Sequence, residues 1–260
     1  MSLLARQRQE LILAEIRERG AVRVSDLAER FGVSDMTVRR DLDVLARRRL
    51  VDKVHGGATA PGETSAEEPE FAVKAGRQRA EKEAIADAAA AFVEPGATIG
   101  LSAGSTTAAL AARLLEVPEL TVVTNSMAVA DVLSGGRPDR TVVLTGGIRT
   151  PSEALVGPVA VAALRSLNLD VVFLGVHGMT TASGFTTPNL MESETDRALV
   201  EAAHRLVVVA DSTKWGTTGI STIAELGEAD VLVTDSGLDP DARAVLEAEI
   251  DRVTIAPVRS

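Results

Sequence analysis

The sequence has no cysteine and only three histidines. Without cysteine the chain can form neither a disulfide framework nor a cysteine-ligated zinc site, and it has no thiol nucleophile. Three histidines leave little from which to build another metal site. We therefore expect neither a metal nor any other cofactor, and a reducing compartment suits this composition.

Long hydrophobic runs are also missing. Apolar stretches such as residues 206–210 and 171–174 have the length of a strand, whereas a membrane helix needs ~18 or more apolar residues. The first nine residues contain only three consecutive apolar residues, too few for the core of a secretory signal. We expect a cytoplasmic protein without a membrane segment.

The charge is distributed unevenly along the 260 residues. A net charge of −10 argues against nucleic acid binding, since phosphate repels an acidic surface. Residues 1–60, however, carry a net charge of +3, and the remaining 200 carry −13. This asymmetry, together with 45% hydrophobic content, predicts a small domain and a larger one with different roles.

A change of composition marks the boundary between these domains. Residues 61–70 are acidic, include Pro61 and Pro69, and lack bulky apolar side chains, as is typical of a linker. We therefore predict an N-terminal domain over residues 1–60, a linker over 61–73 and a larger domain over 74–260.

The larger domain alternates aliphatic runs with helical patterns. The runs are continuous rather than alternating, which indicates parallel strands buried on both faces. We predict a doubly wound α/β domain. The expected strands are residues 98–101, 121–124, 141–144, 171–174, 206–210, 231–234 and 253–256.

The first 60 residues read as three short helices and a hairpin. Apolar spacing predicts a first helix that ends before Gly20, and a second one that follows Ser25 as its cap and ends at Gly32. The residues expected to face the core of these two helices are Leu4, Leu11, Ile12, Ile16, Leu27, Ala28 and Phe31.

A third helix is expected to begin at Ser34, which can cap it, and to bury Val38, Leu42 and Leu45. Residues 50–54 read as a strand, and the glycine turn after it is suited to the wing of a winged helix. Such a helix-turn-helix inserts its second helix into the major groove of DNA. The alternative for Arg39 and Arg40 is a solvated charged surface.

Residues 33–42 (VSDMTVRRDL) and 54–58 (VHGGA) resemble the DNA-binding signature of the DeoR family of bacterial transcriptional regulators. The family usually has glycine where Arg49 stands, so the turn before the wing departs from the pattern. Taken with the exposed side of the third helix, the resemblance implies a set of DNA-binding residues. They are Ser34, Asp35, Thr37, Arg39, Arg40 and His55.

Small polar residues follow several of the predicted strands. In an open parallel sheet, ligands bind outside the carboxyl ends of the strands. Residues 102–107 (SAGSTT) precede a helix whose N-terminus favours an anion, although such turns also serve simply to start helices. With Lys214 as counter-charge, these ends favour a phosphorylated small molecule.

The resemblance to the DeoR family extends over about residues 6–235 and implies a sensor domain similar to the ribose-5-phosphate isomerase and CoA-transferase type of α/β fold. The family commonly has aspartate at Ser102, so a carboxylate is missing there. Asp211 can alternatively cap a turn, and Lys214 can form a surface ion pair. The expected effector-binding residues are Ser102, Gly104, Ser105, Thr106, Thr107, Asn125, Ser126, Gly146, Gly147, Asp211 and Lys214.

A long loop is expected between Gly175 and Met191, and loops of this length inside compact domains are usually functional or disordered. It and the following helix contain His177, Asn189 and Glu194 as candidate specificity residues. No role can be assigned to any of them from the sequence.

These features predict a sequence-specific transcriptional regulator, with repression implied by the resemblance. It should bind operator DNA, respond to a phosphorylated sugar or related metabolite, and form a homo-oligomer. The alternative is a sugar-phosphate isomerase, but enediol chemistry needs a carboxylate base, and the isomerase motifs are missing. We therefore expect no enzymatic activity and no catalytic residues.

Overall fold

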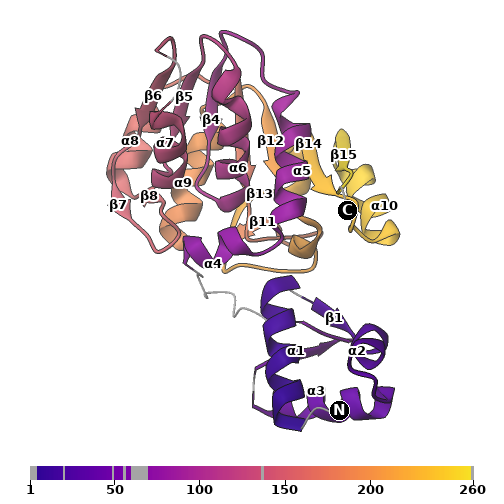
Figure 1. Ribbon diagram of the computed structural model, residues 1–260. Helices are drawn as coiled ribbons and strands as arrows, with labels where there is room; N and C mark the ends of the chain where they lie inside the picture. Colours follow the sequence, from indigo (N-terminus) through magenta and orange to yellow (C-terminus); the bar gives the residue numbers. More distant parts are fainter. Residues whose placement is uncertain are drawn as a thin grey trace. The chain divides into compact units, whose positions relative to one another are not determined.

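The computed structural model describes residues 5–19, 21–48, 50–54, 57–59, 70–135 and 138–258. The chain divides into two compact units, residues 1–64 with 76–78 and residues 65–75 with 79–260 (Figure 1). The predicted linker lies outside the described residues up to residue 69. Its last three residues belong to helix α4 (Phe71–Gly76).

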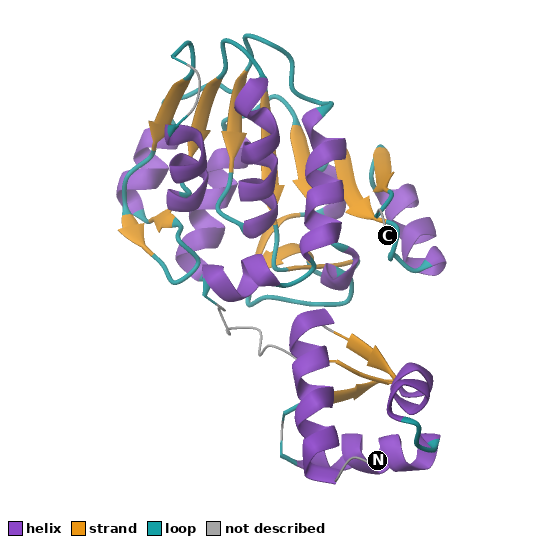
Figure 2. Ribbon diagram, viewed as in Figure 1, coloured by secondary structure: helices purple, strands orange, loops and turns teal. Residues whose placement is uncertain are grey.

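The N-terminal unit consists of three helices and a small antiparallel sheet with strand order β1-β3-β2 (Figure 2). The three helices predicted from the sequence are confirmed, and the predicted strand after them is shorter than expected. The elements are α1 (Ala5–Arg19), β1 (Ala21–Arg23), α2 (Val24–Phe31), α3 (Asp35–Arg47), β2 (Asp52–Val54) and β3 (Gly57–Thr59).

The core of this unit is formed by Ile12, Ile16, Leu27, Leu42 and Leu45, each at most 1% exposed. Most of the residues predicted to face the core do so. Other residues of the same prediction behave differently: Leu4 lies outside the described residues and Phe31 is half-buried.

The prediction for Leu11 was wrong, since its side chain is 44% exposed. Arg8 and Glu15 instead share the buried face of α1 with Ile12 and Ile16. These charges are tolerated because each has a partner: Arg8 Nε donates to Asp41 Oδ2 at 2.5 Å, and Glu15 pairs with Arg30. Apolar periodicity alone does not reveal a charged residue that is buried through pairing.

The second unit is built on a seven-stranded parallel sheet with strand order β15-β14-β12-β9-β4-β5-β6. All seven predicted strands are present, within one residue of the predicted ends. They are β4 (Thr98–Leu101), β5 (Thr121–Thr124), β6 (Thr141–Leu144), β9 (Val171–Gly175), β12 (Leu206–Val209), β14 (Val231–Asp235) and β15 (Arg252–Ala256).

Helices cover both faces of this sheet, which confirms the doubly wound α/β class. Successive strand residues face opposite sides: Phe173 packs with Leu110 of α6, whereas its neighbour Val172 packs with Leu199 of α9. Figure 1 shows α5, α6 and α7 in front of the sheet. The helices of the unit are α5 (Arg79–Ala90), α6 (Ser105–Arg113), α7 (Met127–Ser134), α8 (Pro158–Leu164), α9 (Leu190–Glu201) and α10 (Pro240–Glu249), with short η1 (Leu114–Glu116), η2 (Ser212–Lys214) and η3 (Leu226–Glu228).

Strand β6 departs from the expectation of burial on both faces. Its residues Val143 and Leu144 are 37% and 40% exposed. The reason is its position, since β6 is the last strand of the sheet and pairs only with β5.

The expected long loop between Gly175 and Met191 is largely ordered into strands, so that prediction was wrong. β10 (Gly178–Thr180) and β11 (Gly184–Thr187) form a hairpin, and β13 (Ser221–Ala224) pairs with β11. These strands are short and their third partner comes from more than thirty residues further on, so local pattern did not predict them. A further short pair joins β7 (Ile148–Arg149) and β8 (Leu155–Val156).

No helix in the described ranges combines the length and apolar character that crossing a membrane requires.

Candidate functional site

The beginning of α3 has the geometry predicted from the sequence. Ser34 is the N-cap: its Oγ accepts a hydrogen bond from the backbone N–H of Thr37 at 3.3 Å and lies 3.0 Å from Thr37 Oγ1. Asp35 follows as the first helical residue and is exposed. Its negative charge interacts favourably with the partial positive charge of the helix N-terminus.

One side of α3 is buried and the other is free. Val38 and Leu42 lie in the core, whereas Met36, Arg39 and Arg40 are exposed. Within the described part of the chain, Arg39 and Arg40 form no ion pair, so both guanidinium groups are available. Among the other predicted DNA-binding residues, Thr37 is half-buried and His55 lies outside the described residues.

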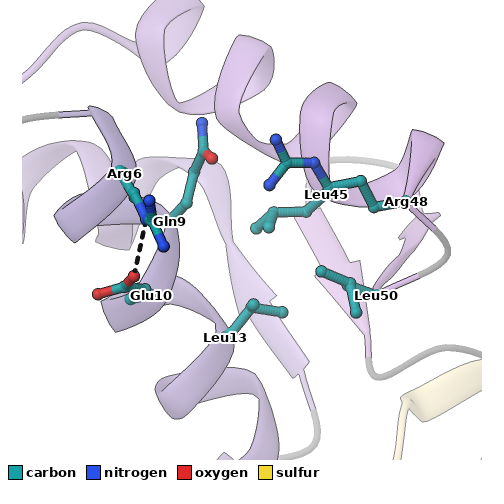
Figure 3. Close-up of a pocket in the computed structure, with 7 residues that line it drawn as sticks. All are labelled: Arg6, Gln9, Glu10, Leu13, Leu45, Arg48 and Leu50. Atoms are coloured by element: carbon teal, nitrogen blue, oxygen red, sulfur yellow. Dashed lines mark hydrogen bonds and ion pairs between the residues drawn. The ribbon is translucent and has the colours of Figure 1, made fainter.

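A pocket of about 390 Å³ lies in the same unit, between α1 and the end of α3 (Figure 3). Leu13, Leu45 and Leu50 supply its apolar lining, and Arg48 and the Arg6–Glu10 pair its polar one. It contains none of the residues predicted to bind DNA or effector.

In the second unit the chain order of the strands reverses between β4 and β9. From β4 the chain proceeds to β5 and β6 on one side, and then returns to β9 on the other. Ligands of open α/β sheets bind at such a switch point. Here Ser102 Oγ, fully buried, accepts a hydrogen bond from Gly175 N at 2.9 Å and so connects the carboxyl ends of the two strands.

The predicted phosphate loop lies at this point. Gly104 is the N-cap of α6 and supplies no side-chain hydrogen bond, so the first N–H groups of the helix have no capping acceptor. Thr107 Oγ1 donates to Gly104 O at 2.9 Å. A Cβ at Gly104 would lie 3.2 Å from Thr107 Oγ1, so a side chain here would require the threonine side chain to move by a few tenths of an ångström. The arrangement is suited to an anion at the helix N-terminus.

Asn125, at the end of β5, joins this loop. Its Oδ1 accepts a hydrogen bond from Ala103 N at 2.9 Å, and the residue is fully buried. Ser126 is also buried, but its Oγ caps α7 by accepting from Val129 N at 3.2 Å. The structure therefore brings Asn125 to the loop and gives the hydroxyl of Ser126 a structural partner.

The remaining predicted effector residues lie further along the same edge of the sheet. Gly147 has φ of +125°, and a Cβ there would lie 2.5 Å from Val156 O, so a side chain is excluded. Asp211 caps η2 by accepting from Thr213 N at 3.2 Å, the alternative considered from the sequence. Lys214 is half-buried and has no ion-pair partner among the described residues, and it makes no recorded contact with the loop.

The three candidate specificity residues in and after the expected loop have different environments. His177 is buried, Asn189 caps α9 by accepting from Met191 N at 2.9 Å, and Glu194 is exposed. Trp215, beside Lys214, packs against the core.

Sequence reasoning missed two acids on α9, Glu192 and Asp196, which are 8% and 6% exposed. Thr150 Oγ1 donates to Glu192 Oε1 at 2.8 Å, and Thr187 Oγ1 donates to its Oε2 at 3.2 Å. Their four-residue spacing places them on one helix face, but nothing in the sequence signals that this face meets Asn125.

The environment of Asp196 favours the protonated acid. Burial raises the pKa of its carboxyl well above the usual value, and the nearby Glu192 carboxylate raises it further. The Asn125 side chain opposes this shift. A buried acid with such a pKa beside a switch point is typical of a functional site.

Known proteins match both units. The model of the DeoR-like helix-turn-helix domain covers residues 8–64, and that of the DeoR C terminal sensor domain covers residues 77–236. A DNA-binding unit followed by a sensor unit defines a transcriptional regulator. The chain belongs to the DeoR family of these regulators.

Relatives span nearly the whole chain. An uncharacterized HTH-type transcriptional regulator of Escherichia coli (strain K12), YgbI, is 36% identical over 94% of this chain and 95% of its own length. YulB of Bacillus subtilis (strain 168), named in the same way, is 35% identical over 98% of both. The glycerol-3-phosphate regulon repressor of E. coli K12 is 30% identical over 88% of this chain and 90% of its own length.

Solved structures resemble the chain more distantly. Ribose 5-phosphate isomerase A from Methanocaldococcus jannaschii aligns with a TM-score of 0.38 and 18% identity, over 52% of this chain and 53% of the isomerase. The eIF2B beta subunit from Chaetomium thermophilum aligns with a TM-score of 0.44 and 12% identity, over 82% and 70%.

Proposed function

We propose that this protein is a repressor whose affinity for operator DNA is controlled by a phosphorylated sugar or polyol bound in the second unit. The observation that carries the effector part is the uncapped N-terminus of α6 at the switch point, with the buried Asn125 amide beside it. Helix N-terminal N–H groups and their partial positive charge favour a phosphate. Lys214 supplies a full positive charge on the same edge of the sheet.

The DNA-binding part rests on the exposed side of α3. Arg39 and Arg40 are accessible cations on α3, the recognition helix in this proposal, and arginine is the side chain that most often reads guanine in the major groove. Repression is supported by the name of the glycerol-3-phosphate regulon repressor.

The protein acts as an oligomer in this proposal. One helix-turn-helix reads only a few base pairs, whereas a symmetric pair contacts two half-sites and doubles the interface. The effector alters DNA binding by favouring one arrangement of the units over another, and its effect cannot exceed its difference in affinity for the two.

The isomerase alternative is disfavoured by the partners of the acids at the strand ends. The carboxylates of Asp211, Asp235 and Glu192 are bound to neighbouring hydroxyl or N–H groups. Enediol chemistry needs a base that faces the substrate, and these three groups are already engaged as structural acceptors.

Calorimetric titration tests the effector site. Wild-type protein is titrated with inorganic phosphate, glycerol 3-phosphate, ribose 5-phosphate and the matching unphosphorylated compounds. We expect the phosphorylated compounds to bind more tightly, and Thr106→Val and Lys214→Ala to weaken them, because each variant alters the surroundings of the anion. Glu201→Gln, an exposed change at the end of α9, serves as control.

Two results would contradict the proposal. If unphosphorylated compounds bind as tightly as their phosphates, the proposed anion site is wrong. Turnover of ribose 5-phosphate in a coupled assay would favour the enzyme instead.

A further inference from the structure

Two buried polar atoms beside the proposed phosphate loop have no hydrogen-bond partner within the described part of the structure. They are Nδ2 of Asn125 and Oδ1 of Asp196. Asn125 is fully buried and Asp196 is 6% exposed. Buried polar groups are nearly always hydrogen-bonded, and an unpaired one costs folding free energy. Such a pair therefore indicates a ligand group that completes it.

The orientation of the Asn125 amide follows from its hydrogen bond. The N–H of Ala103 requires a carbonyl oxygen as acceptor, so Oδ1 faces the loop and Nδ2 is directed away from it. The same side chain also lies within hydrogen-bonding reach of Asp196, and this interaction opposes the rise in the pKa of the Asp196 carboxyl. A donor from β5 and a carboxyl from α9 thus meet next to the phosphate loop.

Glu192 provides the contrast on the same helix. Thr150 and Ser152 both donate hydroxyl hydrogen bonds to its Oε1, and Thr187 donates one to its Oε2. Its carboxylate is therefore occupied by the protein itself. One turn later on the same face, Asp196 receives no hydroxyl hydrogen bond from any residue that the structure describes, although it is just as deeply buried.

We propose that Asn125 and Asp196 together bind one hydroxyl group of the effector. A hydroxyl has one donor and two acceptor positions, so it can accept from Asn125 Nδ2 while it donates to the Asp196 carboxyl. The two residues then select phosphorylated compounds that carry a hydroxyl near the phosphate. Asp196 also supplies, from helix α9, the carboxyl that Ser102 lacks relative to the family pattern. This inference rests on the proposed effector site.

The segment 150–156 lies against this pair. Leu155 N donates to Asn125 O at 2.7 Å, and Met127 N donates to Glu153 O at 2.9 Å. Both unpaired atoms are shielded from solvent, so a bound hydroxyl is enclosed and its entry requires a local rearrangement. Enclosure sharpens discrimination, because a site built for a hydroxyl leaves buried groups unpaired when the ligand lacks one.

Matched probe pairs test the inference on the full chain. Glycerol 3-phosphate is compared with propyl phosphate, and ribose 5-phosphate with 2-deoxyribose 5-phosphate, by calorimetry. We expect wild type to prefer the hydroxylated member of at least one pair by about tenfold or more, the effect of one buried hydrogen bond. Asp196→Leu should abolish the preference and leave affinity for inorganic phosphate within about twofold, whereas Asp196→Asn, which retains polar atoms, should keep part of it.

Glu201→Gln, on the exposed part of α9, should bind every probe as wild type does. Circular dichroism and the melting temperature establish that each variant is folded. If wild type binds the phosphates without preference, or if Asp196→Leu keeps the preference, Asn125 and Asp196 form a structural pair only and the inference is wrong while the phosphate site stands. If wild type binds no phosphate at all, the proposed function and this inference both fail.

Discussion

The two units of the protein bury acidic side chains in different ways. In the N-terminal unit, Asp41 is 4% exposed and both its oxygens are used: Oδ2 by Arg8 at 2.5 Å and Oδ1 by Gln9 at 2.9 Å. In the sensor unit, Asp196 is equally buried but has no cationic partner within the described residues. A fully paired buried carboxylate joins two helices, whereas an incompletely paired carboxyl group is available to a ligand.

The largest effect should follow from breaking the complete pair. Asp41→Ala leaves the Arg8 guanidinium buried without its partner, and the loss of one member of a buried pair costs about 3–5 kcal/mol. Guanidinium chloride unfolding, followed by circular dichroism, should show this loss in the transition of the N-terminal unit.

The double variant Arg8→Met/Asp41→Leu tests the same point with apolar groups. Because both charges are removed together, it should recover most of the stability that Asp41→Ala loses. If the double variant is as unstable as the single one, the Arg8–Asp41 pair contributes more to the free energy of unfolding than the neutralisation of two buried charges.

Binding to DNA should be the next most sensitive property. Arg39→Ala and Arg40→Ala should each weaken operator binding by about 1–3 kcal/mol if the side chain reads a base, and relax specificity at one position. Arg6→Ala removes the same charge from a side chain that is 91% exposed on α1 and should have a smaller effect. Fluorescence anisotropy with operator DNA measures all three, and an unchanged affinity in both α3 variants would mean that α3 is not the recognition helix.

The incomplete pair predicts a pH dependence of stability. Because the pKa of Asp196 is raised in the folded state, its contribution is most favourable below the unfolded value of about 3.9 and is lost as pH rises toward the folded pKa. Asp196→Asn stays neutral. Its stability relative to wild type should therefore increase by about 1.4 kcal/mol per pH unit across that interval.

Unfolding by denaturant at a series of pH values measures this difference. Burial contributes most to the raised pKa of Asp196, the Glu192 carboxylate on the same helix adds to it, and Asn125 at the end of β5 opposes it. Glu201→Gln, exposed on α9, should give a nearly constant difference from wild type. A constant difference for Asp196→Asn as well would mean that the carboxyl is not protonated preferentially in the folded state.

The smallest effect concerns the cap of α3. Ser34→Ala removes the hydroxyl that accepts from Thr37 N and should lower stability by about 1 kcal/mol. Ser166→Ala removes an exposed hydroxyl that caps no helix N-terminus and should change stability less. Thermal unfolding compares the two, and equal effects would argue against the capping role.

Much of the fold was predictable because its signals are local. The seven parallel strands are continuous β-branched or aliphatic runs, and their residues are apolar in succession because helices cover both faces. The start of α3 was predictable because Ser34 and Thr37 are neighbours in sequence and interact within one turn. Ser102, Gly104, Thr107 and Asn125 were found together because the ends of parallel strands meet at one edge.

Other features depend on partners that are distant in the chain. Arg8 is buried where Leu11 was expected because its partner Asp41 lies on another helix. The strands β10 and β11 form a sheet with β13, and no local sequence pattern predicts that β13 pairs with them.

The sequence by itself determined the two-unit plan, the capped helix α3, the parallel sheet and the loop at its switch point, because these follow from short-range periodicity, capping and strand order. Only the tertiary structure decided that Asp196 meets Asn125, which lies about seventy residues earlier in the chain. The site forms because α9 packs against the end of β5 and buries both side chains. Neither the burial nor the contact can be predicted from the local sequence of α9 or of β5 alone.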